Sequence, residues 1–215
     1  MEDAYLTLEA PATGEYKDRG SRFIAYAFPL ENELDWQAHL ETVKKQHPKA
    51  RHHCYAYRIG LDENNYRAND DGEPSGTAGR PILGQIDSFS LTNVFIVVVR
   101  YFGGTLLGTS GLINAYKSSA QAAIESAAIV EKIIGSTFRL AFDYGIMGEL
   151  MNTVKKQGIE ILDQDFGASP TIDISIRRSA VEKTLLEMKA SLLKVSLEEA
   201  ATITNIPGLT ISPLH

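Results

Sequence analysis

The sequence contains a single cysteine, Cys54, among its 215 residues. One cysteine excludes a disulfide framework within the chain and a zinc site built mainly from cysteines. Basic residues are also outnumbered: 21 Lys and Arg stand against 27 Asp and Glu, and the formal net charge is −6. A net negative chain is not expected to coat nucleic acid non-specifically, although it can still carry a local basic face.

Long hydrophobic runs are absent too. The most apolar stretch, residues 94–99, is far shorter than the ~20 residues of a membrane-spanning helix. The first five residues, Met-Glu-Asp-Ala-Tyr, lack the basic and apolar regions of a secretory signal. We therefore expect a cytoplasmic protein in a reducing compartment, without a membrane partner.

Hydrophobic periodicity predicts a mixed α and β domain over residues 1–133. Strands are expected at 5–9, 21–28, 52–59 and 92–102. The last of these is almost continuously apolar, which predicts a strand buried on both faces. Helices are expected at 32–47, after Pro81, and at 109–129. Asn32 is the expected N-cap of the first helix, and the polar stretch 69–79 is predicted to be a loop.

Residues 134–215 predict a second domain in which strand and helix patterns follow the order β-α-β-β-α-β. Its second helix is expected to begin with a capping box formed by Ser179 and Glu182. Its last strand is expected at 195–203. This order is the split βαβ pattern of a ferredoxin-like domain, so the whole chain is assigned to the α+β class.

The strongest candidate for a binding site is the glycine-rich turn that contains Gly103, Gly104 and Gly108. It joins a buried strand to the start of a helix, a geometry that gathers free backbone N–H groups and favours an anion. The spacing resembles a P-loop, but Thr109 stands where the lysine would be, which argues against nucleotide hydrolysis. The other interpretation is that these glycines serve only close packing of the strand and helix.

Two cations and two aromatic residues accompany this turn. No acidic residue occurs between Asp87 and Glu125, whereas Arg100 and Lys117 lie in that interval. Arg100 and Lys117 are candidates to contact phosphate, and Tyr101 and Phe102 are candidates to stack on a base. Arg100 stands at the end of a buried strand, so pairing with Asp71 or Glu73 is the structural alternative.

A second group of polar residues lies in two other segments. It comprises Arg51, His52, His53, Asp70, Asp71 and Glu73. Histidines and carboxylates of this kind could hold a metal ion. Adjacent residues of a strand point to opposite faces, however, so the two histidines are not expected to bind one metal. We therefore predict no metal and no cofactor, and we expect one buried, hydrogen-bonded histidine and one exposed histidine.

Three motifs resemble the YigZ/IMPACT family. They are residues 51–56, residues 70–81 and residues 98–108, and Lys117 stands where the pattern continues. The resemblance covers about the first 130 residues, and the remainder is similar in layout to the small C-terminal domain of bacterial members. It implies an N-terminal α/β domain like domain 2 of ribosomal protein S5, similar to domain IV of elongation factor G, followed by the ferredoxin-like domain.

The resemblance also implies a link to translation, because eukaryotic members regulate an initiation-factor kinase pathway by competing for a ribosome-associated activator. We accordingly expect a non-enzymatic binding or regulatory protein of the translation apparatus. Its partners would be RNA or a ribosome-associated protein, without evident DNA specificity. The alternative is a metal-dependent hydrolase or phosphotransfer enzyme using the histidines and acidic residues. A protein-interaction module that docks through the ferredoxin-like domain is a third possibility.

Overall fold

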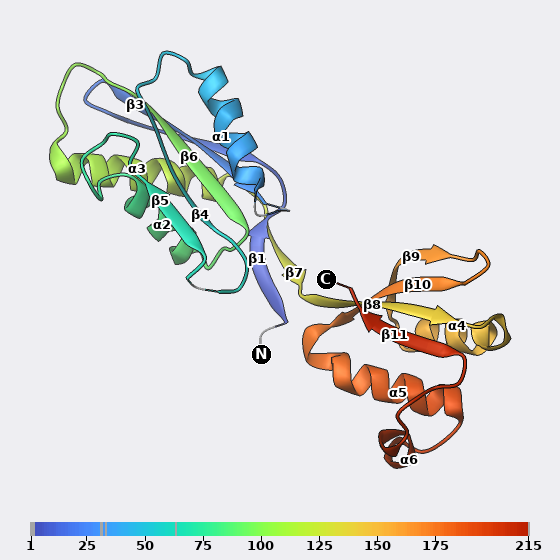
Figure 1. The fold of residues 1–215 in the computed structure, drawn as a ribbon. Coiled ribbons are helices and arrows are strands. Elements are labelled where there is room, and N and C mark those ends of the chain that lie inside the picture. The colour runs from blue at the N-terminus through green and yellow to red at the C-terminus, as the bar shows by residue number, and fades with distance from the viewer. Residues whose placement is uncertain (1–2, 31, 33, 63, 215) are drawn as a thin grey trace. The chain divides into compact units, whose positions relative to one another are not determined.

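The computed structural model describes residues 3–30, 32, 34–62 and 64–214 (Figure 1). The described chain divides into two compact units. The first comprises Tyr5–Lys132, and the second comprises residues 133–214 together with Asp3 and Ala4. Both units combine helices with β-sheet, so the fold is α+β. No helix within the described ranges is long and apolar enough to cross a membrane.

The first unit is built around a five-stranded antiparallel sheet in the order β2-β3-β6-β4-β5. A separate two-stranded sheet pairs β1 with β7. The elements are β1 Ala4–Leu8, β2 Ala12–Asp18, β3 Ser21–Pro29, α1 Asp35–Gln46, β4 His52–Arg58, β5 Tyr66–Asn69, α2 Gly79–Ser88, β6 Val94–Tyr101, α3 Gly108–Glu125 and β7 Ile129–Ile133.

Strand β6 lies at the centre of this sheet and confirms the prediction of a strand buried on both faces. Ile96 and Val98 pack into the core that includes residues of α2 and α3, whereas Val97 and Val99 pack into the core that includes residues of α1. Successive side chains of a strand alternate between its faces, so each face of β6 contributes to a different core. The same alternation decides the direction of the functional side chains at the end of β6.

Three strands of this unit, β2, β5 and β7, were not predicted from the sequence pattern. Strand β2 is rich in polar residues and contains Gly14, and β5 is only four residues long. Both are edge strands, which lack the apolar alternation of a buried strand. Gly14 is required by tertiary packing, because an added Cβ would stand 2.2 Å from the backbone nitrogen of Ala123 on α3.

Helix α1 begins at Asp35, so Asn32 is not its N-cap. The N-cap position is Leu34, which makes no side-chain capping bond. The backbone N–H of Asn32 instead donates to the Asp35 carboxylate at 2.9 Å. The predicted range of this helix also included residue 33, which lies outside the described residues.

The second unit has the strand order β11-β8-β10-β9, with every neighbouring pair antiparallel. Numbered within the unit, the order is 4-1-3-2, the arrangement of a ferredoxin-like domain. Its elements are β8 Gly135–Phe142, α4 Met147–Lys156, β9 Glu160–Asp165, β10 Thr171–Arg177, α5 Val181–Leu193, α6 Leu197–Thr202 and β11 Leu209–Pro213. Ile172, Ile174 and Ile176 lie in its core, as their alternation predicts.

Two local predictions for this unit are wrong. The N-cap of α5 is Ala180, and Ser179 instead donates its backbone N–H and its hydroxyl to the Asp3 carboxylate. The segment predicted as the last strand forms α6, and the strand follows at β11. A capping box formed by Ser196 and Glu199 begins α6 and satisfies the first N–H groups of that helix.

Candidate functional site

The polar loop between β5 and α2 is organised by Asp70. Its carboxylate accepts backbone N–H bonds from Gly76 at 2.8 Å, Ala78 at 3.0 Å and Gly79 at 2.9 Å. Partial burial raises the pKa of Asp70, but the three backbone donors outweigh burial and hold that pKa below its usual value. The ten residues from Asp70 to Gly79 are therefore an ordered loop held around a negative charge.

Replacing Asp70 with asparagine is expected to lower the free energy of unfolding by about 2 kcal/mol at pH 7, because at least one backbone donor would face an amide NH2 group. The folded pKa of Asp70 is lowered. The stabilisation is therefore fully present above the unfolded pKa of about 3.9 and is lost as pH falls through the folded pKa. Urea unfolding of both proteins from pH 7 to pH 2 should show their difference shrinking below about pH 4.

The matched control is Asp62→Asn, because Asp62 is an exposed residue whose bonds stay within its own turn to Asn64. We expect this variant to follow the wild type across the whole pH range. An Asp70→Asn difference that is constant from pH 7 to pH 2 would contradict the role given to the Asp70 charge.

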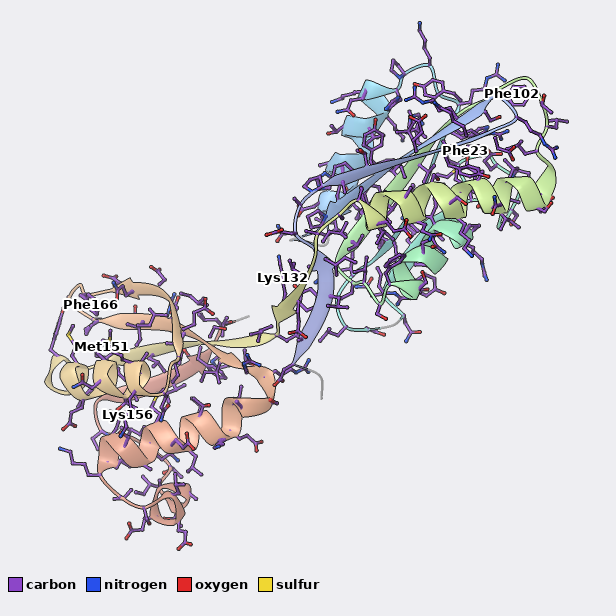
Figure 2. All side chains as sticks on the ribbon, turned by 180° about the vertical axis from the view of Figure 1, so that it is seen from behind. Phe23, Phe102, Lys132, Met151, Lys156 and Phe166 are labelled. Carbon is purple, nitrogen blue, oxygen red and sulfur yellow. The ribbon has the colours of Figure 1, made fainter. Side chains whose placement is uncertain are left out.

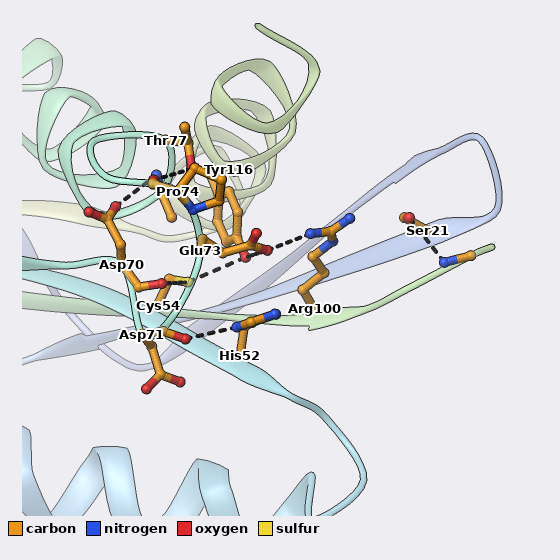
Figure 3. A network of polar contacts seen from close by, with 12 residues as sticks. Ser21, His52, Cys54, Asp70, Asp71, Glu73, Pro74, Thr77, Arg100 and Tyr116 are labelled. Atoms are coloured by element: carbon orange, nitrogen blue, oxygen red, sulfur yellow. Dashed lines mark hydrogen bonds and ion pairs between the residues drawn. The ribbon is translucent and has the colours of Figure 1, made fainter. Parts of the chain in front are cut away.

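Asp71 attaches the loop to strand β4. Its carboxylate accepts the backbone N–H of His53 at 2.6 Å, and its carbonyl lies 2.8 Å from Nδ1 of His52. The chain turns back there through two left-handed residues, Asp71 with φ +43° and Gly72 with φ +86°. Figure 3 shows this turn beside His52. The structure thus brings together the two sequence segments that carry the predicted polar residues.

The centre of the site is a buried ion pair between Glu73 and Arg100. Nη1 of Arg100 donates to Oε1 of Glu73 at 2.6 Å, and their side chains are 8% and 4% exposed. The Tyr116 hydroxyl donates to the same carboxylate oxygen at 2.8 Å. Figure 3 shows the three side chains meeting from the loop, β6 and α3. Of the two roles open to Arg100 from the sequence, the structure shows the pairing with Glu73.

Cys54 lies beneath this ion pair on β4. Its thiol donates to the carbonyl oxygen of Asp70 at 2.9 Å and lies 3.3 Å from the Tyr116 hydroxyl. Burial raises the pKa of Cys54, and burial likewise raises that of Tyr116. A buried thiol held in the protonated form is a poor nucleophile.

The predicted histidines face different surroundings. His53 is buried, and its Nε2 has no hydrogen-bond partner among the described residues, whereas His52 is half-buried. Burial lowers the pKa of His53. Arg51 is exposed beside them. Within the described part of the chain, no three His, Cys, Asp or Glu side chains form a group that could hold a metal ion.

The glycine-rich turn between β6 and α3 packs closely against another segment at Gly103 but not at Gly104 or Gly108. The Gly103 N–H donates to Oγ of Ser21 at 3.1 Å, and an added Cβ at Gly103 would stand 1.9 Å from the carbonyl carbon of Gly20. Gly104 and Gly108 have φ of +88° and +71°, and no heavy atom of another described segment lies within 4 Å of an added Cβ at either. Gly103 therefore serves close packing, and the other two serve the turn.

Arg100 and Tyr101 point to opposite faces of the sheet, which corrects the expectation that they act side by side. The Tyr101 hydroxyl lies 2.8 Å from Nδ1 of His47, on the face covered by α1. Phe102 lies on the side of Arg100, whose Cζ is 5.6 Å from the centre of the Phe102 ring. Of the two aromatic residues that the sequence offered for stacking, Phe102 is therefore the one that lies on the side of Arg100, as the two-residue period of a strand indicates.

Lys117 follows buried Tyr116 on α3 but is itself exposed. The two predicted cations are therefore in different environments: Arg100 is paired with Glu73 inside the protein, and Lys117 faces solvent.

Comparison with known proteins places this arrangement in a family. A 200-residue stretch is 35% identical to an IMPACT family member from Haemophilus influenzae and covers 91% of this chain and 97% of that protein. The chain belongs to the IMPACT family. The model of the Impact N-terminal domain matches residues 19–124, a span that includes the loop, the buried ion pair, the glycine-rich turn and Lys117.

Two further similar proteins show how far the similarity extends. A solved structure described as a hypothetical protein has a TM-score of 0.70 and 27% sequence identity, and it covers 100% of this chain and 99% of its own. The Protein IMPACT homolog of Saccharomyces cerevisiae is 32% identical over 54% of this chain and 46% of its own length. The similarity to the Haemophilus protein and to the solved structure therefore covers nearly the whole of each chain, and that to the yeast protein covers about half.

Proposed function

We propose that this IMPACT family chain is a non-enzymatic binding protein of the translation apparatus. It would contact RNA phosphate or a ribosome-associated protein through its first unit. Membership of the IMPACT family supports the link to translation, because the resemblance of the motifs implies a regulatory role there. The geometry of the site supports binding over catalysis.

The observation that carries this proposal is that the carboxylates of Asp70 and Glu73 and the thiol of Cys54 are bonded inside the protein. Glu73 is paired with Arg100, Asp70 accepts three backbone N–H groups, and the Cys54 thiol is bonded inside the protein. An activated catalytic group needs an accessible side chain with a pKa suited to its task. A preformed internal network instead holds the neighbouring exposed surface in one shape, which favours recognition.

The exposed surface next to this network has the character that an anionic partner requires. Exposed residues include the turn from Phe102 to Leu106 and Lys117. No acidic residue occurs between Asp87 and Glu125 in the sequence, and the first turn of α3 contains none. The positive end of the α3 dipole adds to this field.

Lys117→Gln tests the proposal without disturbing the buried network. We expect this variant to co-sediment less with ribosomal particles at low salt and to show a shallower dependence of binding on salt concentration. The physical reason is that each phosphate contact removed reduces the number of counterions released on binding. The measurement is co-sedimentation of purified protein with ribosomal particles across a salt series.

The matched control is Lys155→Gln, because Lys155 is an exposed lysine on α4 in the other unit. We expect it to bind as the wild type does. If wild-type protein fails to co-sediment at low salt, the proposed function is wrong. If Lys117→Gln and the wild type bind equally at every salt concentration, Lys117 is not part of the contact surface.

A further inference from the structure

Phe102 is a large aromatic side chain that the fold holds at the surface. It follows the last residue of β6 and is 55% exposed, whereas Phe23 and Phe95 in the same sheet are fully buried. Figure 2 marks Phe102 and Phe23 in the first unit. An exposed aromatic ring is apolar surface that a bound partner can remove from water.

The inner side of the Phe102 ring faces a fixed cation. Cζ of Arg100 lies 5.6 Å from the centre of the Phe102 ring and 5.5 Å from the centre of the Phe23 ring. Arg100 is itself held by Glu73 and is 8% exposed. A guanidinium within about 6 Å of a ring is attracted to its face. Arg100 therefore orients Phe102 and leaves the rest of the ring toward solvent.

The backbone on either side of Phe102 keeps the ring in this position. Strand β6 ends at Tyr101, and Gly103 on the other side donates its N–H to Oγ of Ser21. The chain then turns away at Gly104, whose φ is +88°. A pinned backbone reduces the entropy that a side chain loses on binding, so the exposed ring is preorganised for a ligand.

The surroundings of the ring identify the chemistry of that ligand. A flat aromatic surface backed by a guanidinium offers stacking to another planar group, and every nucleobase has such a face. Acidic residues, which would repel a phosphate backbone, do not occur between Asp87 and Glu125 in the sequence. Leu106 stands in the same turn at 81% exposure, and an apolar side chain of this kind can separate neighbouring bases.

We propose that Phe102 is a stacking platform for an unpaired base of single-stranded RNA. The inference deepens the proposed function, on which it rests, by naming the group recognised. Bases that are unstacked in loops and single strands are the usual target of aromatic side chains in RNA-binding proteins. Arg100 acts from beneath as a positioning residue, and Lys117 supplies an exposed positive charge on α3.

The test uses the full chain and a 15-nucleotide poly(A) RNA that carries one 2-aminopurine and a 5′ fluorophore. Anisotropy reports affinity, and 2-aminopurine emission reports stacking. Phe102→Leu keeps an apolar side chain and removes the ring, so we expect affinity to fall roughly 5- to 100-fold and the emission change to disappear. Phe102→Tyr keeps the ring and should bind within about threefold of the wild type.

Phe166→Leu is the matched control, because Phe166 is an exposed phenylalanine of the other unit at 40% exposure. We expect it to leave both signals unchanged. Urea unfolding of each variant shows that the fold is kept, and Phe102→Leu should unfold within about 1 kcal/mol of the wild type, as surface substitutions do.

Two results would overturn the stacking proposal and leave the proposed function standing. One is wild-type protein that co-sediments with ribosomal particles but does not bind the RNA at low salt. The other is a Phe102→Leu variant that binds the RNA as tightly as the wild type does. If that variant also co-sediments less with ribosomal particles, Phe102 contacts a protein and not a base. Failure of the wild type to co-sediment would overturn the proposed function itself.

Discussion

Arg100→Met is expected to lower the free energy of unfolding by about 3–5 kcal/mol, the usual result of removing one partner of a buried ion pair. The methionine fills much of the same volume, but among the described residues the Glu73 carboxylate keeps the Tyr116 hydroxyl as its side-chain partner and loses the guanidinium. An uncompensated charge in a buried site is costly. The measurement is urea unfolding at pH 7, with far-UV circular dichroism as the signal.

The double variant Arg100→Met/Glu73→Gln separates the charge effect from the loss of packing. Glutamine keeps an acceptor for Tyr116 and removes the negative charge, so we expect the double variant to be more stable than Arg100→Met alone. Glu73→Gln by itself should also destabilise the protein, because it leaves the Arg100 guanidinium without its counter-charge. Strictly additive effects of the two substitutions would show that they do not interact and would contradict the ion pair.

This expected loss of stability decides how the binding surface can be tested. A binding assay on Arg100→Ala would report unfolding as well as any lost contact, because Arg100 is 8% exposed and paired with Glu73. Lys117 and Phe102 are exposed and can be changed with the network intact. Binding is therefore tested with substitutions of Lys117 and Phe102, and the free energy of unfolding is tested with substitutions of Arg100 and Glu73.

Gly103→Ala is the second change from which we expect a large effect. Its Cβ would stand 1.9 Å from the carbonyl carbon of Gly20 and 2.1 Å from the backbone nitrogen of Ser21. Backbone atoms cannot rotate out of the way as a side chain can, so the turn must move away from the hairpin of β2 and β3. We expect a loss of about 3 kcal/mol in the free energy of unfolding, the upper part of the range for overpacked sites.

Gly104→Ala is the control in the same turn. No heavy atom of another described segment lies within 4 Å of the added Cβ, but the φ of +88° is unfavourable for alanine. We expect a loss of about 1 kcal/mol from backbone strain. Equal stability of the two variants in urea unfolding would contradict the close packing of Gly103 against Gly20.

The sequence determined the elements with the strongest hydrophobic patterns. The apolar run of β6, the alternating isoleucines of β10 and the first five elements of the second unit, β-α-β-β-α, follow from spacing, whereas the last strand was predicted at the segment that forms α6. Edge strands β2 and β5 did not follow from it, because half-exposed polar residues carry no clear period. Ser179 and Glu182 match a capping pattern, but Ser179 donates its hydrogen bonds to the carboxylate of Asp3, which is far away in the sequence.

For the candidate site, too, the features that depend on neighbouring residues could be predicted from the sequence. The motifs themselves, from residues 51–56 to residues 98–108, and the ordered polar loop were visible in the sequence. The two-residue period of a strand, which separated the two adjacent histidines, also places Phe102 on the side of Arg100 and Tyr101 on the other side. The match to the Impact N-terminal domain over residues 19–124 contains all of these segments.

Only the tertiary structure decided what each polar residue does. Glu73 and Arg100 are separated by 27 residues and Glu73 and Tyr116 by 43, so their meeting depends on how the loop and α3 pack on the sheet. Whether Arg100 is an exposed cation or part of a buried ion pair depends on its desolvation and on a partner from another segment. A local sequence pattern predicts neither of these. Local spacing determines which face of a strand or helix a residue occupies, and packing determines what lies opposite it.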